Sequence, residues 1–326
     1  MPANLTPQYL GAEQRFREAK TREEKIAALE EMYALIPKHK GTDRMQGDIK
    51  RRLSKLRTME EKKAAKQKDL FYISREGAGQ VILIGAPNCG KSLLFNRLTG
   101  ARSESAPYPF TTSRAAPGMM PYQDIKIQLV DTPPFSPERP PMAVSNMLRN
   151  TDLILLIVDI SDKDPQMQIS EVVDVAARMR LILTSEPPRE IEPGNVWKKT
   201  ILAANKCDTP DDEIVFNILK ETIEDRFLCL HISAQNLLGL EELKEELYRQ
   251  LDIVRVYSKQ PGAQPDMDAP FVMKRGGTLM ELARMVHKDF ADNLKYARIW
   301  GTGKFKGQMV HRDYLLQDKD IVELHT

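Results

Sequence analysis

Short apolar runs alternate with amphipathic segments through the middle of this chain. The apolar runs, each expected to form a strand, lie at residues 80–84, 125–130, 153–158, 200–204 and 228–232. The amphipathic segments, each expected to form a helix, lie at residues 91–99, 142–150, 166–183, 211–226 and 239–251. Strands that are apolar on both faces and separated by helices are typical of a mostly parallel, covered sheet. The pattern predicts an α/β domain over residues 78–252.

The two flanks of this domain show other patterns. Residues 8–36 carry an apolar stripe among charges, and a second stripe runs through Ile49, Leu53 and Leu56. These stripes predict a helical N-terminal region over residues 1–75, with a helix from about 48 to 69. In the C-terminal flank, strands are expected at 271–274, 296–300 and 320–324 and a helix at 278–289. They indicate a small α+β domain over residues 253–326.

Charge is balanced over the whole chain but not locally. Lys and Arg number 48 against 46 Asp and Glu, whereas residues 38–68 hold twelve Lys or Arg and four Asp or Glu. Such a block is typical of a segment that contacts a polyanion, although a solvated helix face produces the same pattern. The helical N-terminal region is therefore expected to be basic.

Cysteine usage and hydropathy indicate the compartment. The three cysteines, Cys89, Cys207 and Cys229, are too few and too scattered for a disulfide framework or a zinc site. The polar N-terminus lacks the apolar core of a signal peptide, and the longest apolar run, 153–158, is too short to span a bilayer. We expect a cytoplasmic protein that makes no membrane contact.

A glycine-rich turn follows the first apolar run. Gly85-Ala-Pro-Asn-Cys-Gly-Lys-Ser92 fits G-x-x-x-x-G-K-[ST] between a strand and a helix, the arrangement of a P-loop NTPase. In such a loop the backbone N–H groups hold phosphates, Lys91 reaches the β- and γ-oxygens, and Ser92 ligates Mg²⁺. The residues expected to bind nucleotide here are Asn88, Cys89, Gly90, Lys91, Ser92 and Leu93.

A second motif selects the base. Asn205-Lys206-Cys207-Asp208 follows the apolar run 200–204, and an Asp at its last position accepts hydrogen bonds from the ring N–H and exocyclic amine of guanine. Ser233 and Ala234 follow the run 228–232, where a backbone N–H is placed to meet the guanine carbonyl. We assign base binding to Asn205, Lys206, Asp208, Ser233 and Ala234. The motif predicts GTP, and competition between GTP and ATP tests the alternative of an ATPase.

Two further residues are expected to complete a Mg²⁺ site with Ser92. Asp131 ends the apolar run 125–130, as does the Asp that holds Mg²⁺ in nucleotide hydrolases, often through water. Thr112, in the loop of residues 108–112, offers a hydroxyl to Mg²⁺ and the γ-phosphate, with Thr111 as the alternative.

The residues after Asp131 depart from the common GTPase pattern. Many GTPases have a Gly whose N–H holds the γ-phosphate and then a Gln that orients water, but here Pro134 and Phe135 occupy these positions. Proline has no N–H, and phenylalanine cannot polarise water. Hydrolysis is therefore slow, uses another group or depends on a partner. We expect Asn88 to hold K⁺ beside the phosphates, unless it only shapes the loop, and name Lys91, Thr112 and Asn88 as catalytic.

The motifs resemble a known family over most of the chain. The phosphate loop, Tyr108-Pro-Phe-Thr-Thr112, the strand ending at Asp131 and the Asn205 motif are similar to the Obg branch of GTPases, and more narrowly to developmentally regulated GTP-binding (DRG) proteins. Residues 255–262 and 294–301 resemble their C-terminal TGS domain, which has a ubiquitin-like β-grasp fold. DRG proteins usually have Asp-x-Pro-Gly, so Pro134 departs from the resemblance.

The resemblance implies a GTPase that works near ribosomes or structured RNA. Contact is expected through the basic helix 48–69 and the TGS domain, for which a protein partner stays open. The expected function is slow, Mg²⁺-dependent and K⁺-stimulated conversion of GTP to GDP that couples nucleotide state to ribosome or RNA binding. The alternative is a GTP-dependent scaffold that hydrolyses GTP very slowly or not at all.

Overall fold

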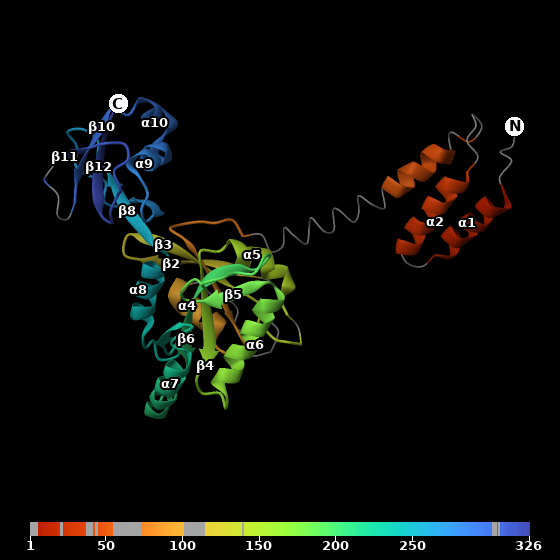
Figure 1. Cartoon of the computed structure of the whole chain (residues 1–326), viewed down its shortest axis with the longest axis horizontal. Coiled ribbons are helices and arrows are strands. Elements are labelled where there is room, and N and C mark those ends of the chain that lie inside the picture. The colour runs from red at the N-terminus through yellow and green to blue at the C-terminus, as the bar shows by residue number, and fades with distance from the viewer. Residues whose placement is uncertain are drawn as a thin grey trace. The chain divides into compact units, whose positions relative to one another are not determined.

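The computed structural model describes residues 6–19, 22–36, 42, 45–54, 73–100, 115–138, 140–301, 305 and 307–326. The chain divides into two compact units, Met1–Tyr72 and Ile73–Thr326. Figure 1 labels the elements of both units.

The first unit is helical. Helix α1 (Pro7–Glu18) begins after Thr6, whose hydroxyl accepts a hydrogen bond from the Tyr9 N–H at 3.3 Å. Helix α2 (Arg22–Leu35) follows, and residues 45–54 form a further helix. The three helices bury a shared apolar cluster that contains Tyr9, Ala12, Leu29, Met32, Ile36, Ile49 and Leu53. Of the helix expected at residues 48–69, residues 48–54 are helical in the structure. Residues 55–69 lie outside the described residues.

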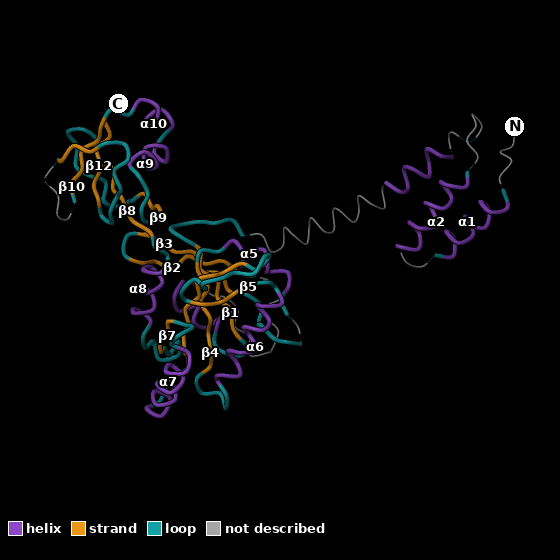
Figure 2. The backbone as a smooth tube through the Cα atoms, viewed as in Figure 1, coloured by secondary structure: helices purple, strands orange, loops and turns teal. Residues whose placement is uncertain are grey.

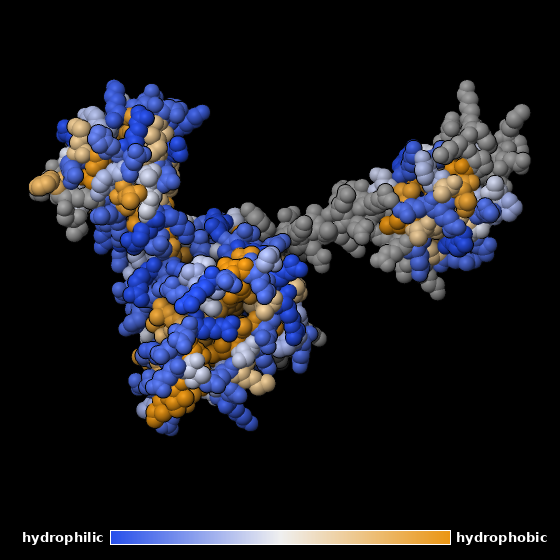
Figure 3. All heavy atoms as spheres, viewed as in Figure 1, coloured by the Kyte–Doolittle hydropathy of each residue, from blue (hydrophilic) through white to orange (hydrophobic). Residues whose placement is uncertain are grey.

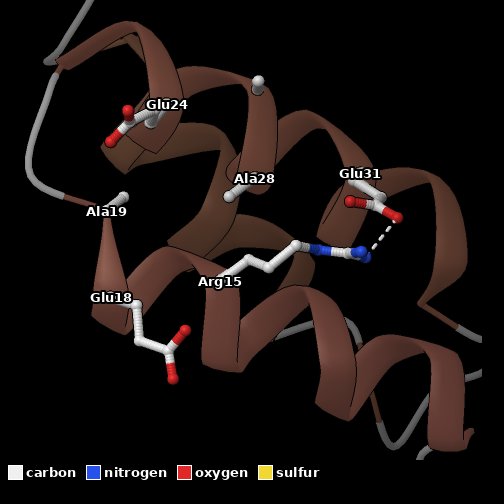
Figure 4. Close-up of a pocket in the computed structure, with 7 residues that line it drawn as sticks. Arg15, Glu18, Ala19, Glu24, Ala28 and Glu31 are labelled. Carbon is white, nitrogen blue, oxygen red and sulfur yellow. Dashed lines mark hydrogen bonds and ion pairs between the residues drawn. The ribbon is translucent and has the colours of Figure 1, made fainter.

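A shallow cavity of about 400 Å³ lies between α1 and α2. Figure 4 shows Arg15 of α1 pointing toward Glu31 of α2, with a nitrogen-to-oxygen distance of 2.5 Å. Glu18 and Glu24 lie at the other end of the cavity, and Ala28 lines the cavity between that end and the Arg15–Glu31 pair. Because both charged groups of the Arg15–Glu31 pair are exposed, the pair adds little to stability.

The second unit contains a seven-stranded sheet with the strand order β2-β3-β1-β4-β6-β5, in which β7 also pairs with β6. The strands are β1 (Gln80–Gly85), β2 (Ala116–Tyr122), β3 (Ile125–Asp131), β4 (Leu153–Asp159), β5 (Leu181–Thr184), β6 (Val196–Asn205) and β7 (Leu228–His231). Every pairing is parallel except that of β2 with β3. The helices are α4 (Lys91–Thr99), α5 (Ser145–Asn150), α6 (Pro165–Arg178), α7 (Pro210–Ile223) and α8 (Leu240–Gln250), with a 3₁₀ turn at Met142–Val144.

In Figure 2 the strands of this sheet are orange, and purple helices lie around them. All six residues of β1 are buried, which accounts for the continuous apolar run there. The expected α/β fold with a mostly parallel sheet is confirmed.

Two features of this sheet differ from the sequence expectation. Strand β2 was not expected, because Pro117 and Pro121 interrupt its pattern; β2 lies at the sheet edge, where a missing N–H is tolerated. The helix expected at 166–183 ends at Arg178, and β5 follows it. Arg180 has a φ of 59°, which turns the chain between these two elements.

A five-stranded sheet with the order β11-β10-β12-β8-β9 completes the second unit. Its strands are β8 (Ile253–Ser258), β9 (Phe271–Lys274), β10 (Tyr296–Trp300), β11 (Gln308–Val310) and β12 (Asp320–His325). Helices α9 (Leu279–Val286) and α10 (Lys288–Asn293) pack with it around a separate apolar cluster. The helix expected at 278–289 breaks at His287, whose backbone is extended. We propose residue 253 as the boundary of the C-terminal domain, because the cluster begins at Val254.

Arg255 joins β8 to the turn between β2 and β3. Its side chain is 3% exposed and lies 2.7 Å from both Asp124 and Asp318. The same guanidinium donates a hydrogen bond to Gln123 at 2.6 Å. A buried cation with two carboxylate partners is costly to separate from them, so this network holds β8 against the β2–β3 turn.

The surface of the second unit is mostly polar in the view of Figure 3, and apolar atoms gather over α7. Ile214 and Ile218 of α7 are 61% and 60% exposed.

Among the helices that the structure describes, none combines the length and apolar character that crossing a membrane requires.

Candidate nucleotide-binding site

The phosphate loop connects β1 to α4 and needs glycine at its last position. Gly90 has a φ of 93°, and an added Cβ would lie 2.3 Å from Nδ2 of Asn205. Asn88 also has a positive φ of 62°, which Asn tolerates better than most residues, and its side chain is exposed. The positive φ angles and the close contact with Asn205 therefore both restrict which residues this loop can contain.

Lys91 is the first residue of α4 and is 7% exposed. Its ammonium donates hydrogen bonds to the carbonyl oxygens of Gly85 at 3.0 Å and Ala86 at 2.9 Å. Both acceptors belong to the phosphate loop, so the cation is held within the loop at the N-terminus of a helix. The positive charge of the ammonium and the partial positive charge of the helix N-terminus both favour the binding of an anion at this position.

Ser92 and Asp131 lie in contact at the end of β3. The Ser92 hydroxyl donates a hydrogen bond to Oδ2 of Asp131 at 2.7 Å, and Asp131 is fully buried. Its other oxygen, Oδ1, has no hydrogen-bond partner among the described residues. Burial raises the pKa of the Asp131 carboxyl above its usual value, against the opposing hydrogen bond from Ser92. A buried carboxylate oxygen without a partner, beside a hydroxyl, fits Mg²⁺, which prefers oxygen ligands.

Asn205 connects the phosphate loop to the base loops. Its Nδ2 donates to the carbonyl of Cys89 at 2.9 Å, and its Oδ1 accepts from the N–H of Ala234 at 3.0 Å. Asn205 is 1% exposed, so both hydrogen bonds are shielded from water. The phosphate and base halves of the site are thus linked through one buried side chain.

Replacing Asn205 with alanine is expected to lower the free energy of unfolding of the nucleotide-free chain by about 2–5 kcal/mol, because the Cys89 carbonyl and Ala234 N–H lose their buried partner. Urea unfolding measures the change. Asn236→Ala is the matched control, because it removes an exposed amide from the same site. Equal losses in the two variants would contradict the linking role of Asn205.

Asp208 is exposed at the base end. Its Oδ1 accepts hydrogen bonds from the Ser233 hydroxyl at 2.5 Å and from Nδ2 of Asn236 at 3.1 Å. Its Oδ2 accepts no hydrogen bond in the part of the chain that the structure describes, so that oxygen is available to a ligand. The side chain is oriented by two neighbours before any ligand binds.

Lys206 makes an ion pair with Asp159, at 2.5 Å between Nζ and Oδ2. Sequence reasoning identified neither Asp159 nor Asn236. Asp159 ends β4 as Asp131 ends β3, so the same strand-end signal was present. Asn236 lies in the loop after Ala234, where no pattern pointed to it.

Of the remaining predicted site residues, the structure describes Cys89, Leu93 and Cys207. Cys89 is buried within the phosphate loop, and Leu93 packs against the core cluster beneath it. Cys207 is buried, and burial raises its pKa to about 11, so its thiol stays protonated near neutral pH. Thr111 and Thr112 lie outside the described residues.

The segment after Asp131 runs against the phosphate loop. Thr132 donates its hydroxyl to the Leu83 carbonyl at 2.7 Å, and the Phe135 N–H donates to the Gly85 carbonyl at 3.0 Å. The Phe135 ring is 1% exposed. Pro134 has no N–H and that of Phe135 is already bonded, so in this arrangement neither backbone position offers a donor to a phosphate.

The chain is similar to known GTP-binding proteins. Residues 80–186 match a family model described as 50S ribosome-binding GTPase, and residues 254–326 match the model of the TGS domain. An uncharacterized GTP-binding protein of Methanocaldococcus jannaschii is 29% identical over 361 residues, covering 93% of this chain and 92% of the relative. Developmentally-regulated G-protein 1 of Arabidopsis thaliana is 29% identical over 368 residues, covering 92% of this chain and 90% of the relative.

A solved structure of a GTP binding protein from Pyrococcus horikoshii OT3 has a TM-score of 0.50 and 16% identity, covering 76% of this chain and 99% of that one. That likeness concerns the fold alone. The chain is a GTP-binding protein with a P-loop GTPase domain and a C-terminal TGS domain. Within this class it is a homologue of the developmentally regulated GTP-binding proteins, which confirms that resemblance. Its place in the Obg branch stays a prediction.

Proposed function

We propose that this protein hydrolyses GTP to GDP with Mg²⁺ and couples its nucleotide state to ribosome or structured-RNA binding in the cytoplasm. The observation that carries the GTP assignment is the junction made by Asn205, which joins the phosphate loop to Ser233 and Ala234 beside the oriented carboxylate of Asp208. The site thereby holds groups for phosphate and for guanine in one connected structure.

In this proposal each residue acts on the phosphates or the base. The Lys91 ammonium neutralises negative charge on the β- and γ-phosphates, and the loop N–H groups at the start of α4 hold their oxygens. Ser92 and Asp131 would hold Mg²⁺, which neutralises charge that develops on the phosphate oxygens. Thr112 is proposed as a further Mg²⁺ ligand, and Ser233 and Ala234 as contacts to the guanine carbonyl.

The hydrolytic step needs a group that Pro134 and Phe135 do not supply. Phe135 is buried, and its N–H is bonded to Gly85, so it neither orients water nor contacts the γ-phosphate in this arrangement. Asn88 is exposed in the phosphate loop, where its amide oxygen can hold a monovalent cation. We assign to K⁺ at Asn88 the charge stabilisation that other GTPases obtain from an arginine.

GTP turnover is expected to be at least about tenfold faster in K⁺ than in Na⁺ at equal ionic strength, because K⁺ would stabilise the transition-state charge. Asn88→Gly should remove the stimulation while keeping GTP affinity, because glycine adopts the positive φ of 62° without strain. Multiple-turnover phosphate release measures both effects. Equal rates in the two salts would exclude a K⁺ role, and a stimulated Asn88→Gly chain would place the cation elsewhere.

Two features support coupling to ribosomes or RNA. Residues 38–68 hold twelve Lys or Arg against four Asp or Glu, which suits phosphate contacts without sequence preference. The matching family model is described as a ribosome-binding GTPase. The TGS domain is proposed as the second contact surface. A protein partner in place of RNA is an outcome that the following test separates.

Ribosome co-sedimentation is expected to be stronger with a non-hydrolysable GTP analogue than with GDP, and weaker at the higher of two salt concentrations. The nucleotide effect tests coupling, and the salt effect tests phosphate contacts. Binding to ribosomes that is insensitive to salt would favour a protein contact. Binding that is equal in both nucleotide states would contradict the coupling.

Pro134 and buried Phe135 also favour a second candidate, a GTP-dependent scaffold with little or no hydrolysis. A single-turnover GTP assay with and without ribosomes separates the candidates. Hydrolysis under either condition supports the enzyme, and its absence under both, with K⁺ present, supports the scaffold.

A further inference from the structure

A pocket of about 220 Å³ lies near the amino-terminal end of β6, whose carboxyl-terminal residue, Asn205, belongs to the nucleotide site. It is lined by Trp197, Lys198 and Lys199 of β6, by Lys274 of β9, and by Asp152 and Asp252. Strand β6 runs from these residues to Asn205, and its pairing with β4 begins at Ile154 with Thr200 and ends at Asp159 with Asn205. The length of the β4–β6 ladder therefore separates this pocket, here called the basic pocket, from the GTP site.

The two carboxylates of the basic pocket already have cationic partners. Asp152 lies 3.2 Å from Lys274 and 3.4 Å from Arg75, and it also accepts the Gln80 N–H at 3.0 Å. Asp252 lies 2.7 Å from Arg275. The close ion pairs of both carboxylates are thus made with Lys274 and two arginines, and not with Lys198 or Lys199.

Of the three lysines that line the basic pocket, Lys198 and Lys199 make no ion pair with a described carboxylate. The Lys198 ammonium donates to the Thr151 carbonyl at 2.8 Å, and the Lys199 ammonium donates to the Gln250 carbonyl at 3.4 Å. Both side chains are partly buried. Burial and the nearby charges of Arg75 and Lys274 lower the pKa of Lys198, against the opposing charge of Asp152. The lining holds three lysines against two carboxylates, so an excess of positive charge lies in a partly buried place; this excess costs free energy, and a bound anion offsets the cost.

We propose that the basic pocket binds a phosphate group through Lys198 and Lys199. Each ammonium has three N–H donors and uses one on a backbone carbonyl, so donors remain for phosphate oxygens. The phosphate can belong to a free phosphorylated molecule or to an RNA backbone. The assignment goes beyond GTP hydrolysis, because the basic pocket shares no residue with the nucleotide site.

Trp197 provides a local reporter, because the chain has two tryptophans and only Trp197 lines the basic pocket. In a Trp300→Phe background, the full chain loaded with GDP and Mg²⁺ is titrated with inorganic phosphate or with a short uridine oligonucleotide. Chloride replaces the ligand at equal ionic strength as the blank, and titration calorimetry accompanies the fluorescence. A saturable change in either signal is expected.

Lys198→Gln is expected to weaken binding about fivefold or more and to reduce its salt dependence, because one phosphate contact is lost. Lys199→Gln is the second variant, and Lys163→Gln, at an exposed site after the opposite end of β4, is the charge-matched control. The melting temperature of Lys198→Gln should not fall, because the substitution removes a partly buried positive charge from a pocket in which lysines outnumber carboxylates. A structural role for this lysine predicts the reverse.

The outcomes decide both the site and the source of the phosphate. A response to inorganic phosphate that Lys198→Gln weakens supports a free phosphorylated ligand, and such a response to the oligonucleotide alone supports an RNA backbone. The proposal is overturned if the parent chain shows no saturable signal with either ligand. It is also overturned if Lys198→Gln and Lys199→Gln bind as tightly as Lys163→Gln.

Discussion

Lys91→Met is expected to lower GTP affinity by about a hundredfold or more. The ammonium of Lys91 is held within the phosphate loop by two carbonyls and is 7% exposed, so its charge acts where solvent screening is weak. Its contacts to the phosphates are charge-assisted hydrogen bonds, each worth about 1.5–3 kcal/mol, and methionine keeps only the apolar stem. Fluorescence titration with a labelled GTP analogue measures the loss.

The control for this variant is Lys220→Met, which removes an exposed lysine from α7. Thermal melting of both variants checks the fold, because the Ala86 carbonyl loses the Lys91 donor while Gly85 keeps the Phe135 N–H. Affinity within tenfold of the parent, in a folded Lys91→Met chain, would remove Lys91 from the proposed phosphate site.

Asp208→Asn is expected to lower GTP affinity by about a hundredfold or more and to raise the affinity for xanthosine triphosphate. In the structure Oδ1 of Asp208 accepts hydrogen bonds from Ser233 and Asn236, and Oδ2 accepts none from the described residues. An asparagine held by the same two donors keeps its oxygen there and directs its NH₂ to the base. That group repels the donors of guanine but donates to the second carbonyl of xanthine.

Competition binding with the two nucleotides measures this exchange of preference. Asp211→Asn is the matched control, because Asp211 lies in the first turn of α7, close after Asp208 in the chain, and is exposed. A uniform loss of affinity for both nucleotides would indicate a distorted loop, and an unchanged GTP preference would remove Asp208 from base recognition.

The sequence patterns predicted the parts of this protein whose causes are local. Strand β1 is buried along its length, so its apolar run was unambiguous, and the loop between β1 and α4 needs glycine at Gly90 for its own backbone. Strand β2 escaped prediction because its tolerance of proline depends on its position at a sheet edge. The break at His287 likewise divides a continuous apolar pattern into α9 and α10.

The connections between distant residues could not be predicted in this way. No sequence pattern pointed to the contacts of Arg255, which is buried against Asp124 and Asp318 from two other parts of the chain. Asn205 was assigned to the base motif, and its hydrogen bond to Cys89 emerged only when the ends of β1 and β6 were brought to one sheet edge. No sequence pattern pointed to a pocket at Lys198 and Lys199, because Lys274, which lines the same pocket, belongs to another sheet.

By itself the sequence determined the nucleotide class and the alternation of buried strands with helices, because phosphate and guanine loops use residue types at short, fixed spacings and buried strands require apolar runs. The tertiary structure decided which charges are compensated. It pairs Asp152 with Arg75 and Lys274, leaves Lys198 and Lys199 with backbone carbonyls, and buries Phe135 against the phosphate loop. Compensation depends on distances of a few ångströms between strands that are far apart in the chain, and such distances exist only after folding.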